Sequence, residues 1–336
     1  MTTTAKLILL LLVFVTAPTK TYAAPREVRE VHYQMGTFLE LTLWHEEPEK
    51  AQRIIRDAVQ EVHRLEEMLS NYDPESVLSN FNAEAGTGPK RVPAELFDLL
   101  KTARALSEKT DGFFDVTVGS LMDLWSEAAE ANQLPSKKQL NELLATVGYR
   151  NLVLHGAEEA EIKRRGMKID LGGIGKGFAV DRVVERLRAQ QMTSALINFG
   201  GSSMAAIGAP PGERGWRVAV QGADGRLRGA LYLRDTALST SGSMGRWWSI
   251  KGKRYGHLIN PLSGYPVTEK RVATAVTRSA TQAEALTKPL VLLGKKALPT
   301  VEKFSNAAAV VISETGAASF SREFRVIASW KDISQP

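Results

Sequence analysis

Between about Pro48 and Leu69, apolar residues recur every three or four positions, which is the spacing of one face of an α-helix. They are Ile54, Ile55, Ala58, Val62, Leu65, Met68 and Leu69. Two further stretches share the pattern. One opens at Pro93, a residue that suits the first helical turn, and the other at Pro135-Ser136. We also predict a helix from Asp181 to about Gln191, and another near residues 282–294.

Strand-like patterns occur over residues 29–44 and dominate the C-terminal half of the chain. The C-terminal segments are 195–199 (ALINF), 216–220 (WRVAV), 230–233 (ALYL), 272–277 (VATAVT) and 307–312 (AAAVVI). Helices thus come early, and strands flank a central glycine-rich loop. Because no repeat or linker divides the pattern, we expect one α+β domain, with a mixed or antiparallel sheet and flanking helices.

The first 23 residues are typical of a secretory signal peptide. Lys6 supplies the positive start, residues 7–15 (LILLLLVFV) form an apolar run, and 21–23 (TYA) offer a cleavage site. The apolar run is too short to cross a bilayer as a helix. We therefore expect a signal peptide over 1–23 that is cleaved, a mature domain over 24–336, and export to the periplasm.

Composition narrows the kinds of partner and site. The sequence has no cysteine, which excludes disulfides, thiolate metal sites and a lipidated N-terminal cysteine. The formal charge of +6 becomes +4 when Lys6 and Lys20 leave with the signal peptide, and no dense Lys/Arg block occurs. Nucleic acid is therefore not an expected partner.

The stretch that says most about chemistry is 169–181 (IDLGGIGKGFAVD). We expect a short strand ending at Asp170, then glycines at 172, 173, 175 and 177 around Lys176, and then a helix. Unobstructed N–H groups, a helix N-terminus and an ammonium group together suit a phosphate. The spacing matches neither the P-loop nor the dinucleotide fingerprint. A turn that only packs helix against strand is the alternative.

Four other segments combine polar and aromatic residues in ways that could serve a ligand. They are 35–37 (MGT), 70–82 (SNYDPESVLSNFN), 110–125 (TDGFFDVTVGSLMDLW) and 238–266, which contains His257. Each has a structural alternative. Tyr72 could be an exposed helix-end residue, the aromatic residues could be core, and Asp115 and Asp170 could be turn carboxylates held by backbone donors. A lone His257 could be a hydrogen-bonded structural histidine.

Taken together, seven segments in order resemble those of the ApbE family. They are 35–37, 70–82, 111–125, 170–181 (DLGGIGKGFAVD), 197–202 (INFGGS), 239–266 (STSG followed by GHLINPLSGYP) and 283–294 (AEALTKPLVLLG). The resemblance covers about residues 30–330 and implies a single ApbE-like, T-fold-like domain. Members of this family are FAD:protein FMN transferases.

The resemblance implies a magnesium-dependent reaction on FAD. The pyrophosphate is split, AMP is released, and FMN is attached through a phosphoester to a threonine of an exported protein. The expected acceptors are subunits of membrane electron-transfer complexes. Phosphoryl transfer requires mainly positioning and neutralised oxygen charge, which suits the glycine-rich loop.

Motif by motif, the resemblance also implies site residues. FAD contacts fall on Met35, Tyr72, Phe113, Phe114, Asp115, Asp170, Lys176 and Ile259, the last through its surroundings or backbone. Metal positions fall on the carbonyl of Gly173 and on Glu284, Thr287 and Lys288. His257 is the candidate base for the acceptor threonine.

The chain departs from the usual family pattern at two of these positions. Glu284 stands where the family usually has Asp, and Lys288 where it usually has Thr. A glutamate keeps oxygen ligands, but an ammonium cannot bind a metal. Our hypothesis is that Lys288 lies against the pyrophosphate and partly substitutes for the metal. Two other functions stay open: an FAD pyrophosphatase with no protein acceptor, and a non-catalytic FAD-binding protein with a degenerate metal site.

Overall fold

The structure, a computed structural model, describes residues 24–243 and 245–332. The predicted signal peptide, 1–23, lies outside the described residues, so its cleavage stays a prediction. Within the described part of the chain, no helix combines the length and the apolar character needed to span a membrane.

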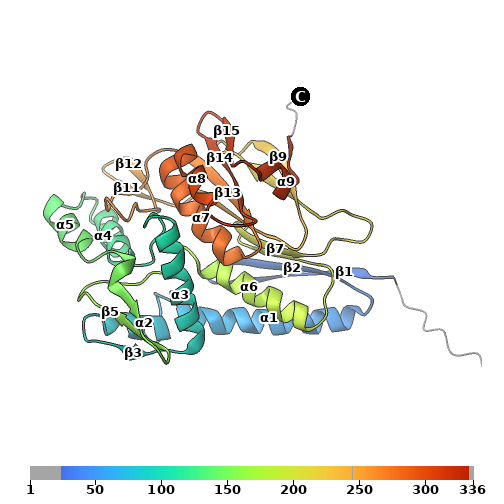
Figure 1. The fold of residues 1–336 in the computed structure, drawn as a ribbon, viewed down its shortest axis with the longest axis horizontal. Coiled ribbons are helices and arrows are strands. Elements are labelled where there is room, and N and C mark those ends of the chain that lie inside the picture. Colours follow the sequence, from blue (N-terminus) through green and yellow to red (C-terminus); the bar gives the residue numbers. More distant parts are fainter. Residues whose placement is uncertain (1–23, 244, 333–336) are drawn as a thin grey trace, which may run out of the picture.

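An eight-stranded sheet forms the centre of the fold, and every neighbouring pair in it is antiparallel (Figure 1). Its order is β1-β2-β6-β7-β10-β13-β14-β15. The strands are β1 (Arg26–Gln34), β2 (Thr37–His45), β6 (Ala195–Phe199), β7 (Ser203–Ile207), β10 (Ala237–Gly242), β13 (Arg271–Thr277), β14 (Ala308–Ser313) and β15 (Ala318–Phe320). The expectation of an α+β domain is confirmed.

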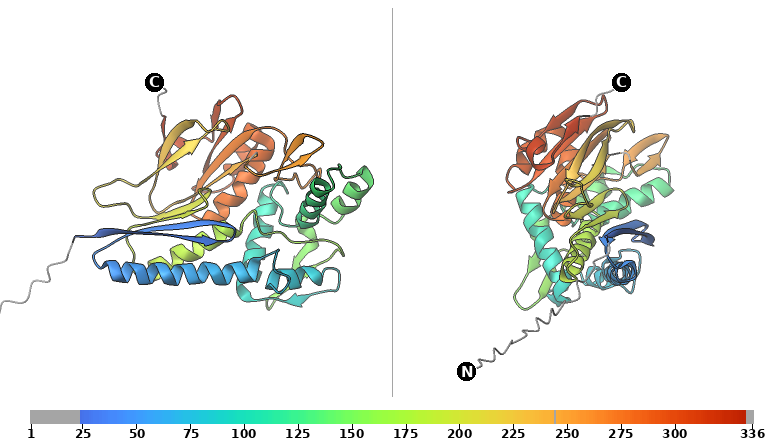
Figure 2. Two further views of the ribbon diagram at one scale, coloured as in Figure 1. Left: turned by 180° about the vertical axis from the view of Figure 1, so that it is seen from behind. Right: turned by 90° about the vertical axis from the view of Figure 1, so that its right-hand side faces the viewer.

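Three helices cover one face of this sheet: α1 (Pro48–Leu69), α6 (Gly175–Ala189) and α7 (Ala280–Leu293). Figure 2 shows α1 and α6 running beneath the β1–β2 hairpin. The predicted apolar stripe of α1 is fully buried in the shared core, and each large aliphatic side chain there contributes roughly 1.5–3 kcal/mol. Glu61 on α1 also pairs with Arg186 on α6, Oε2 to Nη2, at 2.5 Å.

The opposite face is covered by a small sheet, β16-β9-β8, and by the short helix α9 (Phe324–Ile327). The strands are β8 (Trp216–Gln221), β9 (Leu227–Leu233) and β16 (Lys331–Asp332). The position of strand β14 explains why its sequence is continuously apolar instead of alternating with polar residues. Ala309 and Val311 pack in the core between the sheet and the three helices. Val310 and Ile312 pack in the core between the sheet and the β16-β9-β8 layer, so both faces of the strand are buried.

The remaining elements gather at one end of the molecule. Helices α4 (Gly119–Glu130) and α5 (Lys137–Leu144) pack with the hairpin β11 (Trp247–Ile250) and β12 (Lys253–Gly256) around the buried Trp125. The same end holds α2 (Val77–Ala83), α3 (Ala94–Lys109) and the sheet of β3 (Lys90–Arg91), β5 (Glu159–Ile162) and β4 (Leu152–Leu154). The short helix α8 (Leu298–Val301) is the exception and contacts β14. Trp125 Nε1 donates to the carbonyl of Gly264 at 2.9 Å, which anchors the segment after β12.

The strand-like stretch 29–44 is confirmed as parts of two strands, and the chain reverses between them at Met35 and Gly36, where φ is +47° and +72°. Two other local expectations were wrong. Residues 168–171 form no strand beyond a single bridge between Val118 and Lys168, and the following helix starts at Gly175 rather than near Asp181. Half of the glycine run therefore belongs to the first turn of α6.

Gly177 is explained by packing. A Cβ at this position would overlap the carbonyl of Ala280 on α7, whereas a Cβ at Gly175 would meet nothing within 4 Å. The absence of a side chain at Gly177 thus lets α6 and α7 touch at their N-terminal ends. At Gly177, therefore, the glycine is required for packing, as the structural alternative for this loop proposed.

We expect Gly177→Ala to lower the free energy of unfolding by about 1–3 kcal/mol, because the added methyl forces the two helices apart. The matched variant Gly175→Ala should be neutral or stabilising by up to about 1 kcal/mol, since alanine is the better helix former. Urea unfolding of both variants measures the difference. Equal stabilities would show that the α6–α7 contact is not tight.

Candidate functional site

The site is built where α6 meets α7. Asp181 on α6 accepts hydrogen bonds from the first turn of α7: Ala280 N at 2.7 Å, Thr281 N at 2.9 Å, and the hydroxyls of Ser279 and Thr281 at 2.6 and 2.5 Å. One carboxylate thus fills several of the donors that a helix N-terminus leaves open. It fixes the direction of α7, and with it the side chains of the next turns.

Glu284, on the second turn of α7, is the centre of a charged cluster. Its side chain is 3 % exposed, and Oε2 accepts from the N–H of Gly177 at 2.5 Å. Oε1 lies 3.2 Å from Lys176 Nζ. A carboxylate is favourable there, because it sits at the positive end of the α6 dipole. Burial opposes its ionisation, but Lys176, Lys288 and the Gly177 N–H outweigh burial and hold the pKa of Glu284 below its usual value.

Lys288 is the second cation of the cluster, and its side chain is 12 % exposed. Its Nζ donates to the carbonyl of Glu284 at 3.0 Å and lies 4.0 Å from Glu284 Oε1. Its Cε is 3.2 Å from where a Cβ on Gly173 would stand, so it reaches the glycine turn before α6. Burial lowers the pKa of Lys288 to about 8, with Lys176 adding to the shift and Glu284 opposing it. The ammonium form therefore predominates at neutral pH.

His257 directly follows β12, and its pKa responds to the charges of Lys176 and Lys288. Its Nδ1 lies 3.0 Å from the carbonyl of Arg246, and because a carbonyl only accepts, this bond puts the proton on Nδ1 and leaves Nε2 free to accept one. Burial lowers the pKa of His257, and the positive charges of Lys288, Arg246 and Lys176 lower it further. The imidazole is therefore neutral at physiological pH, as a base must be.

The segments holding Asp115 and Asp170 lie side by side, since Asp170 N donates to the carbonyl of Val116 at 2.7 Å. Asp115 accepts from the N–H groups of Thr117 and Tyr149 at 2.9 and 2.7 Å, and Asp170 accepts from that of Gly172 at 2.7 Å. Burial raises the pKa of both carboxyls. Backbone donors hold both side chains, as the structural alternative foresaw.

Phe114 lies between the segment of Asp115 and the glycine turn beside the charged cluster. It is 3 % exposed in the main core, and its ring edge is 3.7 Å from where a Cβ on Gly173 would stand. Phe113 is only partly buried. The ring of Phe114 therefore supports the glycine turn from within the core.

Asn82 on α2 was missed by the sequence analysis, although it stands in the 70–82 segment. Its amide bonds both the N–H and the carbonyl of Ile169, at 2.7 and 3.0 Å, and its Nδ2 is 3.3 Å from Asn71 Oδ1. It thereby ties the loop of Tyr72 to the start of the glycine turn. The only signal in the sequence was the position of Asn82 at the end of the polar 70–82 segment.

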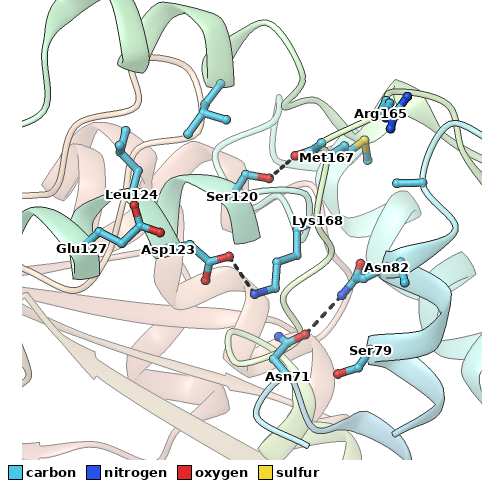
Figure 3. A pocket seen from close by; sticks show the side chains of 14 residues that line it. Asn71, Ser79, Asn82, Ser120, Asp123, Leu124, Glu127, Arg165, Met167 and Lys168 are labelled. Carbon is cyan, nitrogen blue, oxygen red and sulfur yellow. Dashed lines mark hydrogen bonds and ion pairs between the residues drawn. The ribbon is translucent and has the colours of Figure 1, made fainter. Parts of the chain in front are cut away.

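A pocket of about 610 Å³ opens beside this tie, bordered by Asn71, Asn82 and Lys168 among others (Figure 3). Lys168 pairs with Asp123 across it at 2.7 Å. None of the residues of the Lys176–Glu284–Lys288 cluster lines this pocket. The pocket therefore adjoins the Asp170 side of the site rather than its charged centre.

Of the eight expected FAD contacts, Lys176 is bonded to Glu284. Met35, Tyr72 and Ile259 are among those that take no part in this network. Met35 occupies the β1–β2 turn and packs partly against the main core. Tyr72 is 96 % exposed in the loop after α1. Ile259 is 6 % exposed, packs in the Trp125 cluster and pairs with Pro266, so only its backbone could face a ligand. Their contacts with FAD stay predictions.

The four expected metal positions do not form a metal site. Both Glu284 oxygens are engaged, and the Thr287 hydroxyl donates to the carbonyl of Glu284 at 2.7 Å while lying 2.7 Å from Ser241 Oγ. Lys288 brings a positive charge to Gly173, the fourth position. Elsewhere in the described chain, no group of three or more His, Cys, Asp or Glu side chains could hold a metal ion. The residues present do not fit Mg²⁺.

Comparison with known proteins identifies the lineage of this arrangement. The family described as "ApbE family" matches residues 35–312, which is most of the chain. The chain belongs to the ApbE family.

Relatives of ApbE type resemble the chain over most of its length. An FAD:protein FMN transferase of Escherichia coli K12 is 26 % identical over 312 residues, covering 89 % of this chain and 87 % of the relative. One of Klebsiella pneumoniae is 31 % identical over 237 residues, covering 69 % and 72 %. The crystal structure of the Thermotoga maritima ApbE protein matches with a TM-score of 0.81 and 28 % identity, covering 90 % of this chain and 99 % of that one. The expected ApbE fold is thus confirmed.

We expect Glu284→Gln to destabilise the protein by about 3 kcal/mol at neutral pH, because it leaves Lys176 and Lys288 without their buried counter-charge. The pKa of Glu284 is depressed on folding, so its contribution is present above its ordinary value of 4.5 and is lost as pH falls through the folded pKa. The difference between wild type and variant, measured by urea unfolding, should shrink below pH 4.5. A difference that is constant with pH would contradict the charge argument.

Proposed function

We propose that this protein is an FAD:protein FMN transferase. The threonine hydroxyl of an acceptor protein attacks the phosphorus on the FMN side of the FAD diphosphate. The bond from that phosphorus to the bridging oxygen breaks, AMP leaves with the bridging oxygen, and the hydroxyl proton passes to a base. The proposal is supported by membership of the ApbE family and by the activity named for its relatives.

One observation carries the proposal to this chain's own residues: Lys176 and Lys288 meet Glu284 beside the N-terminal turn of α6, and their charges help to lower the pKa of the neutral His257. Lys176 and Lys288 remain 26 % and 12 % exposed, so a ligand can reach them. Two ammonium groups against one carboxylate leave a net positive charge, which is what a diphosphate requires for binding and for loss of AMP. His257 Nε2 is the free imidazole nitrogen that could take the threonine proton.

The partners and the compartment stay proposals. We infer an exported acceptor with a target threonine, belonging to a membrane electron-transfer complex, from the resemblance and from the signal-like pattern of residues 1–23. Magnesium dependence is likewise implied by the resemblance alone, and the residues at the expected metal positions argue against it. We therefore derive the reaction from Lys176, Lys288 and His257 only.

Product analysis tests the proposal. The processed protein is incubated with FAD, with and without an exported acceptor that carries a target threonine. We expect AMP in amounts equal to FMN bound on threonine, measured by chromatography and mass spectrometry. Free FMN and AMP without modified acceptor would indicate a pyrophosphatase, and unchanged FAD would indicate a carrier.

We expect His257→Gln to slow FMN transfer by about 100-fold or more while FAD binding is kept, since the base is lost but the lysines remain. The lowered pKa of His257 places its protonation below the ordinary 6.5, so the wild-type rate should fall only on acidification below that value. The variant should lack this acid limb. A variant with the wild-type rate and pH profile would exclude His257 as the base.

A further inference from the structure

We propose that Lys288 takes the place of a divalent metal ion at the diphosphate site, so that FAD binding and FMN transfer need no metal. The inference rests on the proposed function and concerns the same site. It goes beyond the hypothesis of partial substitution, because the side-chain oxygens expected to hold an ion already have partners and an ammonium group lies among them.

The position of the ammonium supports this step. Lys288 Nζ is held 3.0 Å from the carbonyl of Glu284, and its Cε lies against the open face of Gly173. It thus stands between α7 and the glycine turn, where an ion shared by Gly173 and Glu284 would have to lie. A lysine ammonium has three N–H donors, and the Glu284 carbonyl takes one. The others can serve phosphate oxygens.

The side-chain oxygens expected as metal ligands already have hydrogen-bond or ion-pair partners. Glu284 gives one carboxylate oxygen to Lys176 and the other to the Gly177 N–H. The family's usual threonine ligand is replaced by Lys288, and Thr287, one position earlier, could supply a hydroxyl instead. That hydroxyl, however, is bonded to the carbonyl of Glu284 and to Ser241. Mg²⁺ demands near-octahedral oxygen coordination, and it would also meet the charge of Lys288.

The charge balance agrees with this assignment. Glu284 is neutralised by one lysine, and the second lysine leaves one positive charge for the diphosphate. With threonine at position 288, the cluster would be neutral overall, and an added cation would be required. Lys288 therefore supplies the positive charge that the diphosphate needs without an added cation.

The test compares FAD titrations of the processed protein in excess EDTA and in saturating magnesium, followed by flavin fluorescence. Lys288→Thr removes the ammonium and offers a hydroxyl ligand, whereas Lys288→Met keeps the apolar stem and offers neither. Lys138→Thr is the matched control, since this lysine is an exposed surface residue of α5.

We expect wild type and Lys138→Thr to bind FAD equally well in both conditions, and wild type to transfer FMN in EDTA. Lys288→Met should bind about tenfold more weakly in both conditions, as expected for loss of one charged hydrogen-bond donor. Lys288→Thr should bind about tenfold more weakly in EDTA and recover with magnesium. Mn²⁺ added to the FAD complexes should bind only the threonine variant, as detected by electron paramagnetic resonance.

Two results would overturn the inference while leaving the proposed function intact. One is tightening of wild-type FAD binding by about tenfold or more on addition of magnesium. The other is wild-type affinity of Lys288→Met in EDTA, which would make Lys288 a structural residue. Failure of the wild type to bind FAD in either condition would instead refute the proposed function, and the inference with it.

Discussion

The bond between the Glu284 carboxylate and the Gly177 N–H fixes the rest of the site. It ties the second turn of α7 to the first turn of α6, and it needs Gly177 because any side chain there would separate the helices. Since the carboxylate is buried, it must be neutralised, and Lys176 does so from α6. Lys288, one turn further along α7, then faces the glycine turn as an additional cation.

This constraint explains why an anion site in this chain differs from a simple helix N-terminus. In such a site a phosphate takes the free N–H groups directly. Here a protein carboxylate already accepts from one of them, and in the function that we propose the lysine ammonium groups beside it bind the diphosphate. The neutral His257 is a consequence of the same arrangement, because burial and the nearby lysines disfavour its protonated form.

Much of the scaffold could be predicted from the sequence, for reasons that the structure makes clear. The helix Pro48–Leu69 has the predicted bounds, because it is amphipathic and packs one face on a core. Strands β7 and β10 were not predicted, because small residues such as Ser and Ala make up much of their sequence and no apolar alternation is visible. The start of α6 was misplaced because glycines suggest a loop, whereas Gly177 is required by helix packing.

The residues of the candidate site could be predicted from the sequence, but the hydrogen bonds that hold them in place could not. The motifs indicated Lys176, Glu284, Lys288 and His257. The structure brings the first three together, and the charges of the two lysines act on the pKa of His257. The sequence could not show that Asp181 caps α7, that Asn82 holds the glycine turn, or that Thr287 is turned toward Ser241, because each depends on residues distant along the chain.

The most direct measurement is a crystal structure of the FAD complex grown with Mn²⁺, with anomalous diffraction recorded at the manganese edge. We expect diphosphate oxygens within hydrogen-bond distance of Lys288 Nζ and no anomalous peak between Gly173 and Glu284. A manganese peak there, or a diphosphate bound away from both lysines, would contradict the role that we assign to Lys288.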